Sequence, residues 1–221
     1  MPVRHIEPAA DYARLFEQVK AELPGDADLR AESFARFQQL GFPNQRAEAW
    51  KYTSLKPLAE KAPAAPAPVT VSRAELEPYL LGGDVKRLVF VNGFLASELS
   101  DVEGLPAGLT VTVFDERVGR DRALLAAGDA ERSLTALNAA MAHGGAVVEV
   151  ADGTDVSPTL QLVFVQAGDD GAIANPRNVV RVGAGAKLDM AETWVALADS
   201  GLTNARSEEH TSELQSHAPI S

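Results

Sequence analysis

The sequence contains no cysteine among its 221 residues. A chain without thiols forms no disulfide, has no thiolate nucleophile and cannot ligate zinc or an iron–sulfur cluster through cysteine. Histidine is scarce too, and the four present are His5, His143, His210 and His217. Because two of these fall within the distinctive tail 206–221, too few remain for a histidine-based metal site. We therefore expect no metal or cofactor to be bound by this chain.

Long hydrophobic runs and an excess of basic residues are also absent. No uninterrupted apolar stretch approaches the ~20 residues that span a membrane as a helix. Residues 1–7 (MPVRHIE) lead into a charged helix without the apolar segment of a signal peptide. The formal net charge is −11, whereas nucleic-acid binding needs clustered Lys and Arg. These features predict a cytoplasmic protein that binds neither membranes nor nucleic acids.

Apolar residues at helical spacing predict two short helices, over 10–23 and 28–40, as an N-terminal helical module spanning 1–60. The inward residues of the first are Tyr12, Leu15, Phe16, Val19 and Leu23; those of the second are Leu29, Phe34, Phe37 and Leu40, before Gly41. Residues 61–68 (KAPAAPAP) form a Pro/Ala-rich linker that favours an extended, stiff conformation. We place a module boundary there, followed by a core over 69–205.

The most distinctive stretch is 41–55 (GFPNQRAEAWKYTSL). We interpret Trp50, Tyr52 and Leu55 as anchors that pack this segment across the core. The alternative is that the aromatic rings stack on a ligand. The sequence leaves both open.

Short runs rich in Val, Leu and Phe, bounded by Gly, Asp or Pro, predict strands over 146–150, 159–165, 178–182 and 187–193. Leu160, Leu162 and Phe164 share one face, as do Leu188 and Met190, because side chains alternate along a strand. No long helix separates these strands, so they suit a sandwich or a stacked solenoid, and no repeat of fixed period decides between the two.

A mixed lead-in precedes these strands. The patterns predict strands at 87–91 and 109–114 and helices at 73–81 and 120–127. A further helix is expected to be capped by Ser133 and to end at His143-Gly144.

Polar clusters offer weak candidates for chemistry. Glu192 with Asp189 and Lys187 could form a carboxylate pair, but alternation puts Glu192 on the opposite face, so a solvated outer face is the better interpretation. Asp152-Gly153 and 169–171 (DDG) are typical of turns, with calcium ligation as the alternative.

Two further candidates are weaker. His143 suits the dipole at a helix end better than a metal, and 183–185 (GAG) lacks the strand-to-helix context of a phosphate loop. We assign no catalytic, cofactor-binding or metal-ligating residue from the sequence.

Several motifs occur in order along the chain: 41–55, LVFVNG (88–93), LTALNAA (134–140), PTLQL (158–162), PRNVV (176–180) and LDMAE (188–192). Through them the chain resembles the SufB/SufD family, the scaffold proteins of SUF-system iron–sulfur cluster assembly. Its short helical lead-in is more similar to the SufD branch than to the SufB branch.

The resemblance implies a mainly β fold with α: an N-terminal helical module followed by the first part of a right-handed parallel β-helix. It implies a scaffold, not an enzyme, that works with SufB and the ATPase SufC. It also implies that the Fe–S cluster is handled by the complex, and the absence of cysteine here is compatible with that role.

An enzyme that acts on acidic polysaccharide is the competing functional class, because such enzymes share the parallel β-helix. That function needs basic and carboxylate side chains that converge in a groove, together with a secretion signal. The sequence predicts neither.

Residues 206–217 (RSEEHTSELQSH) break the strand pattern: they are polar and without periodicity. They resemble the translation of a common short-read sequencing adapter. Our hypothesis is that the native sequence runs to about Ala205 and that 206–221 is a non-native tail. The chain would then be C-terminally truncated, with the rest of the β-helix and most contacts with SufB and SufC missing.

Overall fold

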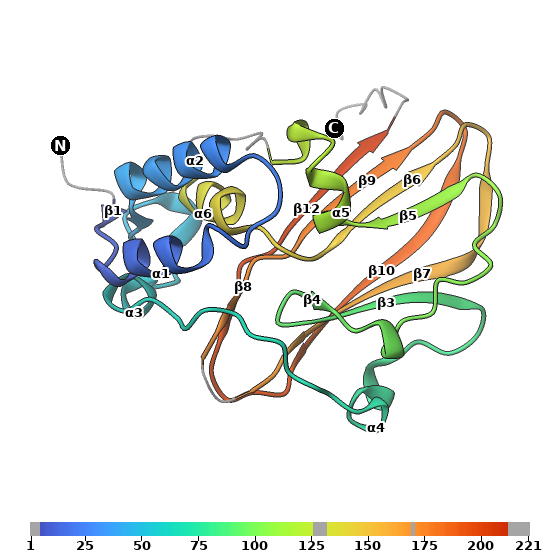
Figure 1. The fold of residues 1–221 in the computed structure, drawn as a ribbon, viewed down its shortest axis with the longest axis horizontal. Helices are drawn as coiled ribbons and strands as arrows, with labels where there is room; N and C mark the ends of the chain where they lie inside the picture. Colours follow the sequence, from blue (N-terminus) through green and yellow to red (C-terminus); the bar gives the residue numbers. More distant parts are fainter. Residues whose placement is uncertain (1–4, 126–131, 169–170, 212–221) are drawn as a thin grey trace, which may run out of the picture.

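A computed structural model describes residues 5–125, 132–168 and 171–211 of the chain. Helices α1, α2, α3 and α6 gather at one end, and two sheets extend away from them (Figure 1). The helices are α1 (Asp11–Val19), α2 (Ala27–Leu40), α3 (Lys56–Glu60), α4 (Arg73–Leu76), α5 (Phe114–Val118) and α6 (Ser133–Met141). Short 3-10 helices are η1 (Glu48–Trp50), η2 (Glu77–Tyr79), η3 (Ser97–Leu99) and η4 (Arg122–Leu125). No helix in these ranges is long and apolar enough to cross a membrane.

The strands follow the helical lead-in and occupy most of the second half of the chain. They are β1 (His5–Ile6), β2 (Phe42–Pro43), β3 (Val85–Val91), β4 (Phe94–Leu95), β5 (Leu109–Val113), β6 (Ala146–Val150), β7 (Asp155–Gln166), β8 (Ile173–Ala174), β9 (Arg177–Val182), β10 (Lys187–Ala196), β11 (Leu202–Thr203) and β12 (Arg206–Thr211).

The N-terminal helices form as their apolar spacing predicts. Tyr12 and Phe16 of α1 are buried against Phe34 and Phe37 of α2, and the rings of Phe16 and Phe34 stack with centroids 4.3 Å apart. Asp26 begins α2, because its side chain accepts the Leu29 N–H at 2.9 Å. Helix α1 ends at Val19, earlier than the predicted Leu23, although Leu23 still packs against the same core.

The helical module does not have a core of its own. Its buried residues pack with Leu137 and Met141 of α6 and with Ile173 of β8, segments that lie far later in the sequence. Residues 61–68 are likewise held in place: Ala64 forms a parallel bridge with Ala172, and Asn92 Nδ2 donates to the Ala67 carbonyl at 3.2 Å. The Pro/Ala stretch is extended, as predicted, but it lies along the later strands.

Strands β7, β8 and β9 are followed along the chain by β10, β11 and β12, which stack on them in the same order. Strand β10 pairs in parallel with β7, β11 with β8, and β12 with β9. Below this stack, β3 pairs in parallel with β7 and β6 with β9, whereas β4 and β5 are antiparallel to their neighbours. The two larger sheets have the orders β10-β7-β3-β4 and β12-β9-β6-β5, and neither closes into a barrel.

The two sheets bury their facing sides against each other. Leu160, Leu162 and Phe164 belong to one buried cluster with residues of β3, β6 and β9, which confirms their predicted shared face. Leu188 and Met190 of β10 pack partly buried against the same cluster. The parallel pairing of successive strands differs from the hairpin pairing of an antiparallel sandwich, and β4 and β5 are the antiparallel exceptions in the two larger sheets.

The structure differs from the sequence predictions at three places. Residues 73–81 form a short α4 and η2, begun by a capping box at Ser72. The helix predicted at 120–127 is the 3-10 turn η4 in the described part, and its last two residues lie outside the described ranges. Ser133 does not cap α6: Arg132 holds the N-cap position, and Ser133 is the first helical residue.

Candidate functional site

Three aromatic rings form a column between the sheets, one from each of three adjacent parallel strands. Phe90 of β3 stacks on Phe164 of β7 with ring centroids 5.3 Å apart, and Phe164 stacks on Trp194 of β10 at 4.3 Å. The strand register aligns the three positions. Phe90 and Phe164 are buried, but Trp194 is 43% exposed. The column therefore ends in an indole ring that reaches the surface.

Trp194 is exposed because β10 is the last strand of its sheet among the described residues. Strands β11 and β12 occupy the same outer position in their sheets. An edge strand presents backbone N–H and C=O groups that can pair with another strand. We call the outward edge of β10, β11 and β12, together with Trp194, the open edge. Chemically it offers strand pairing and apolar contact.

Polar side chains join the two sheets behind this edge. Asn178 of β9 is fully buried; its Oδ1 accepts the Ala146 N–H at 3.0 Å, and its Nδ2 donates to Glu192 of β10 at 2.9 Å. Near the bend, Asn204 Nδ2 donates to Asn175 Oδ1 at 3.1 Å. Asn175 and Asn204 follow β8 and β11 and so lie in corresponding positions of successive layers, while Asn178 links β9 to β10. Together they satisfy buried polar groups and couple one layer to the next.

Glu192 departs from its expected place. Lys187 and Asp189 are exposed, and Lys187 lies 3.5 Å from Asp155. Glu192 is on the opposite face, as alternation predicts, but that face is the space between the sheets and not a solvated surface, because its carboxylate accepts from Asn178 and Ser207. The three side chains therefore do not form a carboxylate pair for acid–base chemistry.

The segment 206–211 forms strand β12, contrary to the absence of strand pattern in its sequence. Arg177, fully buried, is 2.6 Å from Glu208 through Nη2 and 3.3 Å from Asn138 Oδ1 through Nη1. Burial lowers the pKa of Arg177, and the charge of Glu208 acts in the opposite direction. A polar sequence without apolar alternation can thus pair with β9 through its backbone groups. Residues 212–221 lie outside the described ranges.

The predicted turns contact one another across successive layers. Asp152 Oδ1 accepts the Ala184 N–H at 2.8 Å, and the Gly153 N–H donates to the Ala184 carbonyl at 2.8 Å. A Cβ at Gly183 would lie 2.5 Å from the Asp152 backbone nitrogen, so this corner needs glycine. Asp152 and residues 183–185 therefore act as turn residues. Asp169 and Asp170 lie outside the described residues.

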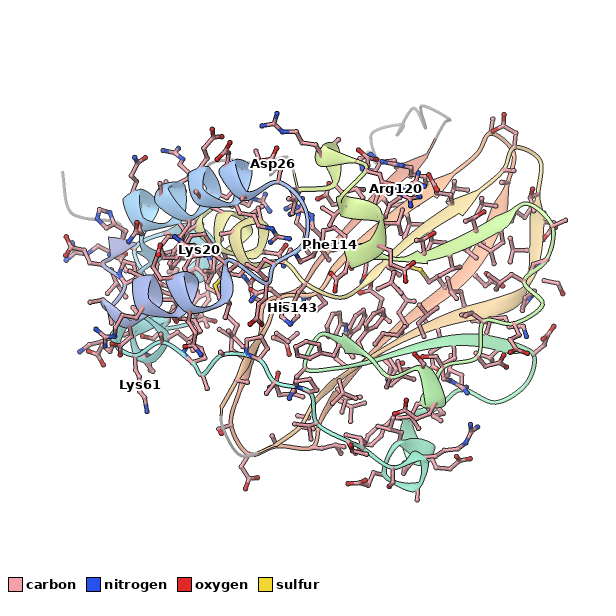
Figure 2. All side chains as sticks on the ribbon, viewed as in Figure 1. Lys20, Asp26, Lys61, Phe114, Arg120 and His143 are labelled. Atoms are coloured by element: carbon pink, nitrogen blue, oxygen red, sulfur yellow. The ribbon has the colours of Figure 1, made fainter. Side chains whose placement is uncertain are left out.

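His143 connects the helical end of the molecule to the sheets (Figure 2). Its ring is buried, with Nε2 3.0 Å from the Asn92 carbonyl and Nδ1 3.2 Å from the Met141 carbonyl. Asp115 lies nearby, because its Oδ1 accepts the Gly144 N–H at 2.8 Å. Across the described ranges no three His, Asp or Glu side chains gather as a metal site would require. The contacts of His143 are those of a residue that fixes the chain between α6 and β6.

Of the expected anchors in 41–55, two pack and one does not. Leu55 is buried and Trp50 packs against the helical core, whereas Tyr52 is 90% exposed. The prediction that Tyr52 packs against the core is therefore wrong. Because η1 ends at Trp50, the next residues run outward as an irregular turn, and the alternation that would bring Tyr52 inward does not hold.

The sequence reasoning also missed buried polar residues, among them Arg30 and Gln161. Arg30 of α2 donates to the carbonyls of Pro24, Ala140 and Ala142, and so caps the end of α6. Arg30 lies four residues before the buried Phe34, and this helical spacing could have predicted its burial. Gln161 of β7 is fully buried and accepts from Leu81 N–H and Arg87 Nε, while its amide donates to Tyr79 and Thr193.

The chain folds as a mixed α/β protein whose stacked parallel strands end at an open sheet edge. Residues 7–162 match the SufBD protein N-terminal region, and the chain belongs to the SufBD family. It is 30% identical over 165 residues to an iron-sulfur cluster assembly SufBD family protein of Synechocystis sp., which covers 72% of this chain and 36% of that protein. The chain thus spans little more than a third of the length of that relative.

Proposed function

We propose that the chain is part of a SufD-like scaffold subunit of SUF iron–sulfur cluster assembly. The observation that carries the proposal is the open edge: parallel strands stacked layer on layer, ending at an exposed Trp194, in a chain of the SufBD family. Such an edge suits contact with further strands or with a partner subunit.

In the same proposal the stacked strands are the first turns of a right-handed parallel β-helix. The parallel pairing of β7, β8 and β9 with β10, β11 and β12 supports this architecture. Its partners are SufB and SufC, and it acts in the cytoplasm as a scaffold without catalysis of its own. The Fe–S cluster is the cargo of the complex and is not bound by this chain alone.

A SufB-like paralogue is the nearest alternative, because both branches belong to the matched family. A β-helix enzyme that acts on acidic polysaccharide is less well supported. Such an enzyme needs carboxylates that converge in a groove, whereas Glu192 is separated from Asp189 and bonded to Asn178.

We also propose that 206–221 is a non-native tail and that the natural protein continues with a different sequence. The resemblance of 206–217 to a translated adapter supports this. Strand β12 does not oppose it, because an open sheet edge pairs through backbone groups that every residue except proline carries. Independent long reads across the locus test it: an uninterrupted reading frame through these codons would refute the tail hypothesis.

Affinity purification tests the scaffold proposal. A full-length clone of the gene, tagged and co-expressed with SufB, SufC and SufD of the same organism, is expected to retain SufB and SufC. Retention of SufD in place of SufB would identify the SufB-like branch, and retention of none would refute the proposal. The present chain, which we expect to be poorly soluble, should lose SufC in the same experiment; normal retention of SufC would contradict the truncation.

A further inference from the structure

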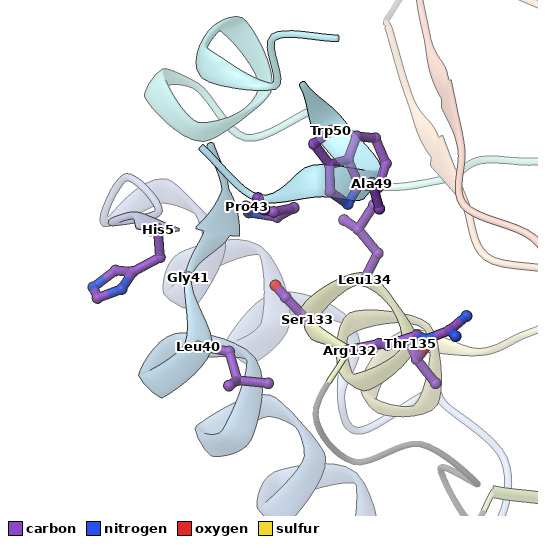
Figure 3. A pocket seen from close by; sticks show the side chains of 11 residues that line it. His5, Leu40, Gly41, Pro43, Ala49, Trp50, Arg132, Ser133, Leu134 and Thr135 are labelled. Atoms are coloured by element: carbon purple, nitrogen blue, oxygen red, sulfur yellow. The ribbon is translucent and has the colours of Figure 1, made fainter. Parts of the chain in front are cut away.

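A cavity of about 690 Å³ opens where the N-terminus of α6 faces the segment 41–50 (Figure 3). This volume lies within the range of about 300–1,000 Å³ typical of small-molecule sites. Its apolar walls come from α2, β2, η1 and α6: Leu40, Pro43, Ala47, Ala49, Trp50 and Leu134. Leu134 points toward Ala49 and Trp50, whereas the ring of His5 points away from Ser133 (Figure 3).

Ser133 places an unused hydrogen-bonding group in this cavity. Its side chain is 9% exposed, and its Oγ has no hydrogen-bond partner in the structure. The oxygen points from α6 toward the segment that carries Gly41 and Pro43, which also line the cavity (Figure 3). A buried hydroxyl without a partner costs free energy, about 1–3 kcal/mol. A ligand atom that bonds to it would remove that cost.

The surroundings of Ser133 favour a negative charge. Ser133 begins α6, and no side chain caps the helix there, so the first-turn N–H groups point toward the cavity end with the positive end of the helix dipole. Arg132 lies on the rim, and none of the described lining residues is acidic, in a chain of net charge −11. The uncapped start of α6 therefore favours a negative charge at this end of the cavity, and the wall near Trp50 is apolar.

We propose that this cavity binds a small organic anion: a carboxylate or phosphate head at Ser133 and the α6 N-terminus, and a flat apolar body against Trp50 and Leu134. The proposal is independent of the role in cluster assembly, since it concerns the side chains of Ser133, Leu134 and Trp50 and not strand pairing at the open edge. It also gives the ring of Trp50 the ligand-stacking role that the sequence leaves open.

Ligand-observed ¹⁹F NMR on the full chain, fused to a solubility partner, tests the proposal, with the fusion partner alone as the blank. The probes are 4-fluorobenzoate, 4-fluorophenyl phosphate and the neutral 4-fluorobenzyl alcohol. We expect saturable binding of at least one anion, with the neutral probe binding at least tenfold more weakly. Which anion binds more tightly identifies the head group. Absence of saturable binding by both anions overturns the proposal, and so does equal binding of the neutral probe.

The variant Ser133→Ala assigns the site. Because a hydrogen bond to a charged group is lost, anion binding should weaken about tenfold or more, while binding of the neutral probe stays the same. Ser97→Ala, at an exposed serine of η3, is the matched control and should change nothing. Unfolding of Ser133→Ala should occur at the same denaturant concentration or higher, because an unpartnered hydroxyl is removed. Unchanged anion binding in Ser133→Ala, or lower stability, overturns the assignment.

Discussion

Trp194 stacks on Phe164 with ring centroids 4.3 Å apart and an angle of 16° between the ring planes. Phe164 is covered on its other side by Phe90, whereas Trp194 has one ring face toward the open edge. The same column thus contains an enclosed ring and a surface ring on neighbouring strands, and this difference governs what each contributes to stability.

Phe164→Ala should lower the free energy of unfolding by about 3–5 kcal/mol, because it leaves a cavity inside the column. Trp194→Ala should cost about half as much or less, since its side chain is already 43% exposed. Urea unfolding followed by circular dichroism measures both. Trp194→Phe, which keeps a stacking ring, is the control and should lie close to wild type. Equal losses for the two alanine variants would contradict the enclosed position of Phe164.

Arg30→Lys should destabilise the protein by about 3 kcal/mol, because one ammonium cannot reach all the carbonyls that the guanidinium serves. Arg30 Nη2 donates to Ala142 at 2.8 Å and Nη1 to Ala140 at 3.1 Å. Burial also lowers the pKa of Arg30 to about 10, so a lysine there would be easier still to deprotonate. Chemical denaturation compares it with Arg36→Lys on the exposed face of α2, which should change stability by less than about 0.5 kcal/mol. Similar behaviour of the two variants would refute the capping role.

Asp115→Asn should gain stability relative to wild type as the pH rises from below 3.8, the ordinary pKa of aspartate, to neutrality. Burial raises the pKa of Asp115, against the opposing effects of the Gly144 N–H, His143 and Arg30. The folded state therefore binds this proton more tightly than the unfolded state, so its stabilising contribution is present at low pH and is lost as the carboxyl ionises.

The asparagine keeps an oxygen that can accept the Gly144 N–H, so the comparison isolates the charge. Urea unfolding across the pH series measures the difference between variant and wild type, with Glu103→Gln at an exposed position as the control. A difference that shrinks toward neutrality would reverse the assigned direction.

Gly93→Ala should destabilise the protein by more than about 2 kcal/mol, because positive φ and a steric clash act together. Gly93 has φ +90°, and a Cβ there would lie 2.3 Å from His143 Nε2. Gly104 has φ +62° with open space around it, so Gly104→Ala should cost only about 1 kcal/mol. Thermal unfolding compares the pair. A Gly93→Ala variant no less stable than Gly104→Ala would mean that His143 moves freely away from the turn.

The sequence determined the elements whose signals are local. Short Val-rich runs bounded by turn residues marked strands β6 and β9, and helical spacing placed Phe34 and Phe37 inside. These predictions succeed because strand-forming residues, turn residues and the helical period act through the local backbone. The ordered motifs also indicated the family that residues 7–162 match.

Only the tertiary structure decided which elements meet. The pairing of β10 on β7, the inward carboxylate of Glu192, the outward ring of Tyr52 and the cavity at Ser133 depend on segments far apart in the chain. Strand pairing is made by backbone groups that nearly all residues share, so the side-chain pattern carries little information on the partner. That is why residues 206–211, polar and without alternation, still lie as strand β12 beside β9.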